Sequence, residues 1–219
     1  MPKLLLFGNP NLRKYKNKKT KKTIKKIKKT VKKVKKTVKI ILKKHIKCKS
    51  VACQKKHLLK VLRNTKFPLN QSRRNVMHTE QESYEGFVLG KINLIPYWAN
   101  KKGHKQELSV RTKDPKFREL YRNTRLLLIL HDPKFKFTTI QYNKNQQAAK
   151  HKDGRNVGVS YIIGLGNYTG GELFVYDEND ENPVKHDIKN KFYSFNGSTH
   201  FHETAPFKGE RYTMVFFNV

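Results

Sequence analysis

The residues whose types and spacing could do chemistry lie in the last third of the chain. His151 and Asp153 are separated by one residue, so on an extended strand both side chains point the same way and can present a nitrogen and a carboxylate to one centre. His202 would add a second imidazole. Two histidines and one carboxylate are the ligands of non-haem Fe(II) sites, which leave coordination positions open for a chelating cosubstrate and dioxygen.

A second group begins nine residues after His202. Arg211, Thr213, Val215 and Phe217 alternate with other residues, so on one strand they would all face the same side. A guanidinium group that is buried needs an anion as a partner, and a pocket beside a metal centre could hold one. We therefore expect Arg211 and Thr213 to lie deep in the domain, beside the metal centre.

The elements that must position these side chains are predicted to be short strands. Strand-like runs occupy residues 137–142, 157–163, 172–176, 191–195 and 211–218, separated by Gly, Asn, Asp and Pro clusters. Before them, residues 115–130 have helical periodicity after an early proline, and the apolar stretch at 87–96 is typical of a strand or a buried loop. This order predicts a mostly β fold of the α+β class, a sandwich or jelly roll with flanking helices.

The charge of the chain is distributed unevenly. The 219 residues include 49 Lys plus Arg and 16 Asp plus Glu, for a net charge of +33. No acidic residue precedes Glu80, and residues 1–79 hold 28 of the basic residues. Only 36% of the residues are hydrophobic, which is low for a uniform globular protein, and the shortage lies in this lysine-rich third. We therefore expect a basic arm over residues 1–66 and one folded domain over 67–219, with a jelly-roll core at about 135–219.

The arm contains a lysine-rich repeat whose apolar residues recur three and four apart, at Ile24, Ile27, Val31, Val34, Val38 and Ile41. This spacing forms one face of a helix, but like charges on the other faces would destabilise that helix in water. Two interpretations stay open, a helix that forms on an anionic surface and a disordered lysine tail. A helix on an anionic membrane is a third, which lacks an aromatic anchor.

No apolar run approaches the roughly 20 residues needed to cross a bilayer, and the apolar stretch at residues 4–7 is too short for a secretory signal. We therefore expect a soluble, intracellular protein that is not secreted. The two cysteines, Cys48 and Cys53, lie in the basic arm without a further Cys or His pair at zinc spacing. We expect them to be reduced and without a structural role.

Three segments carry a resemblance to a known family. The ending from Phe195 to Phe217 resembles the second-histidine segment of 2-oxoglutarate oxygenases. Together with His151-Lys-Asp-Gly-Arg-Asn156 and the run Gly164-Leu-Gly-Asn-Tyr-Thr-Gly-Gly171, it is similar to the TET and JBP branch, dioxygenases that oxidise the 5-methyl group of cytosine or thymine in DNA. The similarity is strong over about residues 137–219, fainter from Tyr84 and absent from the arm.

The resemblance implies a double-stranded β-helix in which His151, Asp153 and His202 hold Fe(II). His200 lies two residues before His202 and could point the same way. His202 is preferred because Pro206 follows it by four residues and the arginine by nine, as in the family.

The same resemblance implies roles for three residues around the cosubstrate. Arg211 would bind the distal carboxylate of 2-oxoglutarate, and Thr213 occupies the hydroxyl position of the family's Arg-x-Ser/Thr pair. Asn143, on the strand before the metal motif, is a further candidate for holding the cosubstrate, although an asparagine near a strand end is commonly a turn former.

The resemblance also indicates contacts to a base flipped out of the nucleic acid. Asn156 stands where an amide can read a Watson-Crick edge, since an amide both donates and accepts hydrogen bonds. Phe217 stands where the family stacks an aromatic ring on the base. The chain departs from the family at Val219, where the family has a further base-contacting histidine.

The implied activity is hydroxylation of the 5-methyl group of 5-methylcytosine or thymine in DNA, dependent on Fe(II), 2-oxoglutarate and dioxygen. The lysine arm would bind the phosphate backbone independently of sequence, and the nucleus or another compartment that contains DNA is the expected location. One alternative is a protein hydroxylase of the prolyl type, which shares the metal ligands and the distal basic residue. Another is a non-catalytic nucleic-acid-binding protein in which the arm is the functional part.

Overall fold

The computed structural model describes Thr23, Cys48, Arg73, Val76 and Met77 and residues 50–70, 83–93 and 106–219. The chain divides into two compact units, residues 1–47 and 48–219. Only Thr23 is described in the first unit, so the expected lysine-rich helix lies outside the described residues. The architecture below is that of the second unit.

The described helical elements precede most of the strands. They are α2 (Val51–Asn64), α3 (Val110–Lys113), the 3-10 turn η3 (Pro115–Phe117) and α4 (Arg118–His131). Ser50 caps α2 by accepting a hydrogen bond from the backbone N–H of Cys53. Asp114 caps η3 in the same way, ahead of Pro115, which confirms the helical start predicted at this proline. None of the described helices is long and apolar enough to span a membrane.

Among the described residues, the larger sheet is antiparallel and contains seven strands. Its path runs β1-β2-β4-β10-β5-β8, and β3 pairs with β2 beside this path. The strands are β1 (Leu69–Asn70), β2 (Tyr84–Asn93), β3 (Gln106–Leu108), β4 (Thr139–Lys144), β5 (Ser160–Gly170), β8 (Phe192–Phe195) and β10 (Phe207–Phe217). Strand β10 is hydrogen-bonded on both sides, to β4 and to β5.

A smaller sheet of three strands has the order β7-β6-β9. Its members are β6 (Leu173–Val175), β7 (Val184–His186) and β9 (His202–Thr204). Residues of both sheets, including Thr213 from β10 and His202 from β9, line one cavity, so the two sheets face each other. This arrangement confirms the expected mostly β fold with flanking helices.

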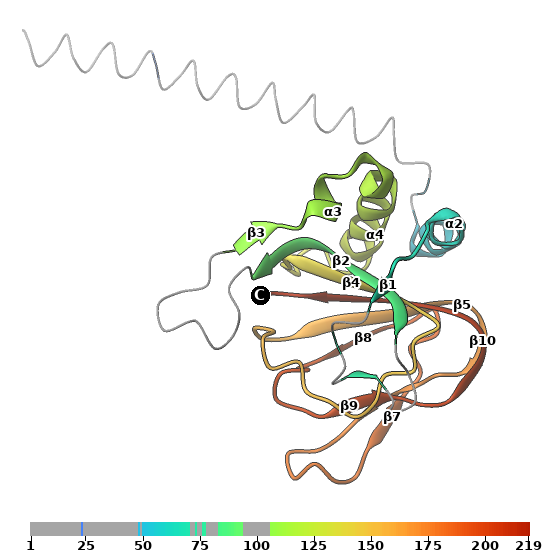
Figure 1. Ribbon diagram of the computed structural model, residues 1–219, viewed down its shortest axis with the longest axis vertical. Helices are drawn as coiled ribbons and strands as arrows, with labels where there is room; N and C mark the ends of the chain where they lie inside the picture. Colours follow the sequence, from blue (N-terminus) through green and yellow to red (C-terminus); the bar gives the residue numbers. More distant parts are fainter. Residues whose placement is uncertain are drawn as a thin grey trace, which may run out of the picture. The chain divides into compact units, whose positions relative to one another are not determined.

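The helices cover the face of the larger sheet that points away from the cavity (Figure 1). Leu58 and Leu62 of α2, with Leu127 of α4, pack in one buried cluster with Met214 and Phe216 of β10. Because side chains alternate along a strand, the residues between these on β10 point to the opposite face. One strand therefore supports both the main core and the cavity.

The domain boundary expected at residue 66 is wrong. Helix α2 belongs to the folded unit: Leu58 and Leu62 are fully buried, and Gln54 donates from Nε2 to the backbone oxygen and to Oδ1 of Asn123. The helix carries four Lys and Arg residues and no acidic residue. This composition resembles the arm, while a single apolar stripe anchors the helix on the core.

The expectation that the cysteines are reduced is also wrong in this structure. Cys48 and Cys53 form a disulfide, with their Cα atoms 5.3 Å apart. The cap at Ser50 turns the chain into α2 and brings the residue before the helix close to its first turn. This turn is the physical reason why two positions five residues apart come within bridging distance.

The strand expectations are confirmed for β4, β5, β6, β8 and β10, which overlap the five predicted runs. The stretch at 87–96, for which strand and buried loop were both open, contributes to β2. The short strands β1, β3, β7 and β9, of two or three residues each, were not predicted.

Gly166 provides a test of the register that holds β5 on β10. It lies opposite Arg211 with φ +130°, and an added Cβ would lie 2.1 Å from the backbone oxygen of Glu210. We expect Gly166→Ala to lower the free energy of unfolding by about 3 kcal/mol, measured by urea denaturation. Gly158→Ala is the control, because Gly158 also has positive φ but has no neighbouring atom within 4 Å of an added Cβ. Equal losses in the two variants would contradict the predicted clash.

Candidate metal centre and cosubstrate pocket

The two histidines of the predicted triad are brought together by the backbone. His151 and His202 form an isolated antiparallel bridge in which each backbone N–H donates to the other's carbonyl oxygen at 3.0 Å. The two imidazole ring centroids are 4.3 Å apart. The bridge thus places side by side two residues that are far apart in the sequence.

Asp153 completes the cluster. Its Oδ1 lies 3.8 Å from Nε2 of His151, and its Oδ2 lies 3.8 Å from Nε2 of His202. One ligand atom from each of the three residues lies within 4.8 Å of the others, so the group is able to hold one metal ion. The backbone N–H of Asp153 donates to the oxygen of Gly197, which fixes the turn that carries the carboxylate.

The tautomers of both histidines suit a metal ligand. Nδ1 of His151 lies 2.7 Å from the backbone oxygen of Ala149, and Nδ1 of His202 lies 3.1 Å from that of His200. A carbonyl oxygen only accepts, so each Nδ1 carries the proton and each Nε2 presents a lone pair to the cluster.

Burial keeps the two imidazoles neutral. Burial lowers the pKa of His202 to about 4, and the neighbouring His151 acts in the same direction. Burial also lowers the pKa of His151, although Asp153 opposes this shift. At neutral pH both histidines therefore have free lone pairs, and a metal ion does not compete with a proton for them.

Arg211 is almost completely buried, with 2% of its surface exposed. Its Nη1 and Nη2 donate to the backbone oxygens of Gln146 and Gly171 at 3.2 and 2.9 Å, and its Nε is buried without a partner. Burial lowers the pKa of Arg211 to about 10, so the guanidinium remains charged at neutral pH. Within the described residues it forms no salt bridge, and this cation therefore lacks a counter-ion.

A polar chain lies beside Arg211, on the same face of the sheet. Thr213 of β10 pairs with Asn143 of β4, and Asn143 Nδ2 donates to Thr213 Oγ1 at 3.2 Å. Gln141 Nε2 in turn donates to Asn143 Oδ1 at 2.8 Å. These bonds fix the orientation of the Asn143 amide and the Thr213 hydroxyl in the cavity.

The predicted substrate residues also border this cavity, which has a volume of about 800 Å³. Phe217 lies at the end of β10 and is half-buried. Asn156 lies beside the metal cluster, and its Nδ2 donates to Oδ2 of Asp153 at 3.2 Å. The cavity thus brings together all eight predicted site residues: Asn143, His151, Asp153, Asn156, His202, Arg211, Thr213 and Phe217.

Two residues that line the site, Arg73 and Gln141, were missed from the sequence, and Asn145 supports the site from outside the cavity lining. Arg73 Nη2 lies 2.7 Å from Asp153 Oδ1, a contact between residues 80 apart that no local pattern indicates. Gln141 shares a face with Asn143, and the strand period could have revealed it. Asn145 has a positive φ of 51° and accepts the backbone N–H of Arg211 at Oδ1, so it fixes the backbone from which the guanidinium extends.

Metal titration tests the choice of His202 over His200. We expect His202→Ala to weaken Mn(II) binding about a hundredfold or more, measured by anaerobic isothermal titration calorimetry, because one of three ligands is removed. His200→Ala is the matched control and should bind within threefold of the original protein, since His200 is not in the cluster and its Nδ1 contacts the backbone oxygen of Tyr176. Equal affinities in the two variants would count against the assignment.

Comparisons with known proteins give similarities at low sequence identity. No family model matches the chain, and no curated protein matches it. It is similar to an oxidoreductase of the 2OG-Fe(II) oxygenase family from Burkholderia pseudomallei, with 15% identity, 74% of this chain and 76% of that chain covered, and a TM-score of 0.48. It is also similar to NgTET1 in complex with 5mC DNA, with 13% identity, coverage of 77% and 67%, and a TM-score of 0.45.

A third similar structure is a prolyl hydroxylase from Trichoplax adhaerens in complex with a hypoxia inducible factor peptide fragment. It has 14% identity, coverage of 76% of each chain and a TM-score of 0.43.

Proposed function

We propose that the protein is an Fe(II)- and 2-oxoglutarate-dependent dioxygenase that hydroxylates the 5-methyl group of a pyrimidine base, 5-methylcytosine or thymine, in DNA. One observation carries the proposal. The His151, Asp153 and His202 cluster shares a cavity with Arg211, a buried cation that has no counter-ion within the described part of the chain.

The donor set fits Fe(II). Two neutral imidazole nitrogens and one carboxylate oxygen occupy one side of a centre and leave its other positions to a cosubstrate. Each histidine is held by a hydrogen bond from Nδ1 to a backbone oxygen. Such bonds orient metal ligands before the ion arrives, which reduces the cost of binding it.

The surroundings of Arg211 fit the distal carboxylate of 2-oxoglutarate. Among the residues that the structure describes, the guanidinium has no salt-bridge partner, and the Thr213 hydroxyl lies two residues along the same strand face. Gly171 keeps this space open, because an added Cβ would lie 2.7 Å from Arg211 Nε. A dicarboxylate would satisfy the buried charge and fill the polar end of the cavity.

Bound Fe(II), with 2-oxoglutarate and dioxygen, would supply the oxidant that hydroxylates a C–H bond. The residues of the chain would position the metal, the cosubstrate and the substrate, and form the walls around them. Arg211 and Thr213 hold one end of the cosubstrate, the histidines and Asp153 fix the metal, and Val215 and Phe217 give the cavity an apolar wall that limits water near the reacting carbon.

Several features of the cavity favour a base as the substrate. Phe217 offers an aromatic face at the cavity, and stacking of a base on such a ring is worth about 1 to 3 kcal/mol. Lys91, Lys152 and Arg155 also line the cavity and would favour an anionic polymer at its mouth. The Asn156 amide, held on Asp153, would read the base edge nearest the metal. The nucleus or another compartment that contains DNA remains our proposal for where this reaction occurs.

Removal of the buried cation tests the cosubstrate site. We expect Arg211→Gln to raise the KM for 2-oxoglutarate ten- to a hundredfold, because a charged hydrogen-bonding partner contributes about 1.5 to 3 kcal/mol. The measurement is succinate release at varied 2-oxoglutarate. Arg63→Gln is the control: it also removes an arginine, but one that is half-exposed and paired with Glu210, and it should leave the KM unchanged. An unchanged KM in Arg211→Gln would exclude Arg211 from the cosubstrate site.

Product analysis tests the substrate. We expect mass spectrometry of nucleosides to detect 5-hydroxymethylcytosine or 5-hydroxymethyluracil after incubation of the protein with methylated or unmodified DNA, Fe(II) and 2-oxoglutarate. Phe217→Ala should lower this yield about tenfold, because stacking is lost, while succinate release without substrate persists. Succinate release stimulated by a proline-containing peptide and not by DNA would favour a prolyl-type hydroxylase. Nucleic-acid binding with no succinate at all would favour a non-catalytic binding protein.

A further inference from the structure

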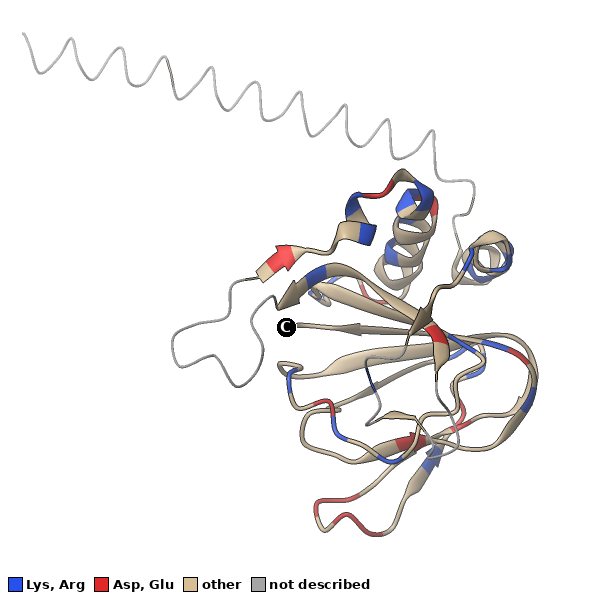
Figure 2. Cartoon of the chain, in the orientation of Figure 1, with Lys and Arg blue, Asp and Glu red and all other residues tan. Residues whose placement is uncertain are grey.

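The positive charge of the folded unit is concentrated on its helices. Residues 50–70 and 109–136, which contain α2, α3, η3 and α4, hold 13 Lys and Arg against three acidic residues. The other described residues of this unit hold 11 Lys and Arg and 11 acidic residues. Figure 2 shows Lys and Arg residues in blue on the helices and an acidic loop in red between β6 and β7. The helical layer is therefore basic, while the rest of the described unit is electrically balanced.

A groove of about 600 Å³ runs between these helices, separate from the metal site. Lys60 and Lys66 line it from α2 and the residues that follow it, and Arg111 and Lys116 line it from α3 and η3. The groove thus has fixed cations on both walls. Asp114 and Glu119 also line it, so its fixed charge is +2, and Asp114 is already engaged as the cap of η3.

The four cations of this groove have no carboxylate partner among the described residues. All four are exposed, and the salt bridges of the described unit involve other residues. Arg63 on the same helix shows the contrast, because it is paired with Glu210. Exposed and unpaired cations on both sides of a groove favour an anionic chain that lies between them.

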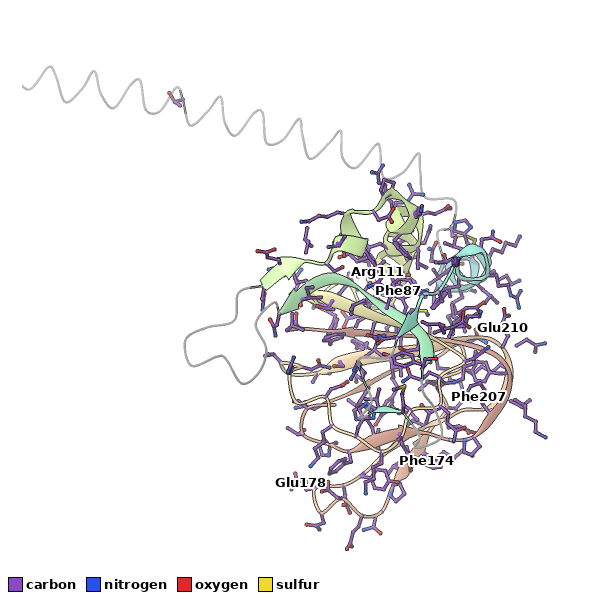
Figure 3. The ribbon with its side chains drawn as sticks, viewed as in Figure 1. Phe87, Arg111, Phe174, Glu178, Phe207 and Glu210 are labelled. Carbon is purple, nitrogen blue, oxygen red and sulfur yellow. A yellow bond between two sulfur atoms is a disulfide. The ribbon has the colours of Figure 1, made fainter. Side chains whose placement is uncertain are left out.

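The groove and the cavity use opposite faces of the larger sheet. Met214 and Phe216 of β10 face the helical core, whereas Thr213 and Val215 face the cavity. In Figure 3, Arg111 lies in the helical layer, and Glu178 lies at the far end of the domain. A ligand in the groove would therefore not displace a ligand in the cavity.

We propose that this groove, between α2 and α3 with η3, binds the phosphate backbone of a nucleic acid. A concave channel with charge on two walls suits a strand, while a bilayer presents a flat surface. The proposal does not depend on the chemistry of the cavity, since the groove would bind nucleic acid whether or not the protein oxidises a base.

Lysine footprinting of the full-length protein tests the groove directly. Acetylation of the native protein, read by mass spectrometry, should fall at least threefold at Lys60, Lys66 and Lys116 when a 20-nucleotide DNA duplex or single strand is present. The exposed Lys134, Lys136, Lys185 and Lys208 lie outside the groove and should keep their reactivity. Unchanged reactivity of the groove lysines would overturn the proposal, and so would protection only by phosphatidylserine vesicles or only by polyglutamate.

A charge-neutralising variant gives a second readout. The groove variant combines four substitutions, Lys60→Gln, Lys66→Gln, Arg111→Gln and Lys116→Gln. It should reduce the slope of log affinity for nucleic acid against log salt concentration by about three, because each phosphate contact contributes about 0.7 to 0.9 to the slope. The control variant also removes four positive charges, through Lys134→Gln, Lys136→Gln, Lys185→Gln and Lys208→Gln. It should change the slope by less than one. Equal changes in the two variants would overturn the proposal. Succinate release should remain normal in both, which separates this test from that of the proposed function.

Discussion

The rest of the domain depends on the constraint that strand β10 must serve two different environments at once. It is hydrogen-bonded on both sides, so it is held in the middle of the larger sheet. Tyr212, Met214 and Phe216 enter the core beneath α2 and α4, while the residues between them line the cavity. A shift of one residue would exchange these sets and place a guanidinium in the apolar core. Packing of the helices therefore fixes the register of the site.

The buried charge of Arg211 explains much of the backbone geometry around it. Removal of a cation from water costs several kcal/mol, and only two of its donor groups find backbone oxygens. Asn145, with positive φ, accepts the backbone N–H of Arg211, and Gly166 allows close approach of the opposite strand. These features hold a cation whose compensation in the free protein is incomplete. An incoming carboxylate would recover part of that cost, which is how the site would favour its cosubstrate over water.

The sequence predicted the chemical groups of the site better than it predicted the contacts that hold those groups in place. Alternation along residues 211–217 was enough to place Arg211 and Thr213 on one face, and the long strands that carry them were predicted as well. The contact of Arg73 with Asp153 and the bridge between His151 and His202 depend on distant segments meeting, which no local period encodes. Helix α2 was assigned to the arm because its lysines dominated the composition. Only packing shows that Leu58 and Leu62 belong to the core.

The basic groove and the cavity lie on opposite faces of the larger sheet, and this separation has a consequence for specificity. Phosphate contacts in the groove would add affinity on the helical face, but they carry no information about which base is present. Under the proposed function, discrimination would therefore arise on the other face, from the fit of a base against Phe217 and the Asn156 amide. Because the Asn156 amide is tied to Asp153, base recognition and metal geometry would be coupled there. A poorly fitting base would disturb the ligand set as well as the stacking, so selectivity would be expressed in turnover more than in binding.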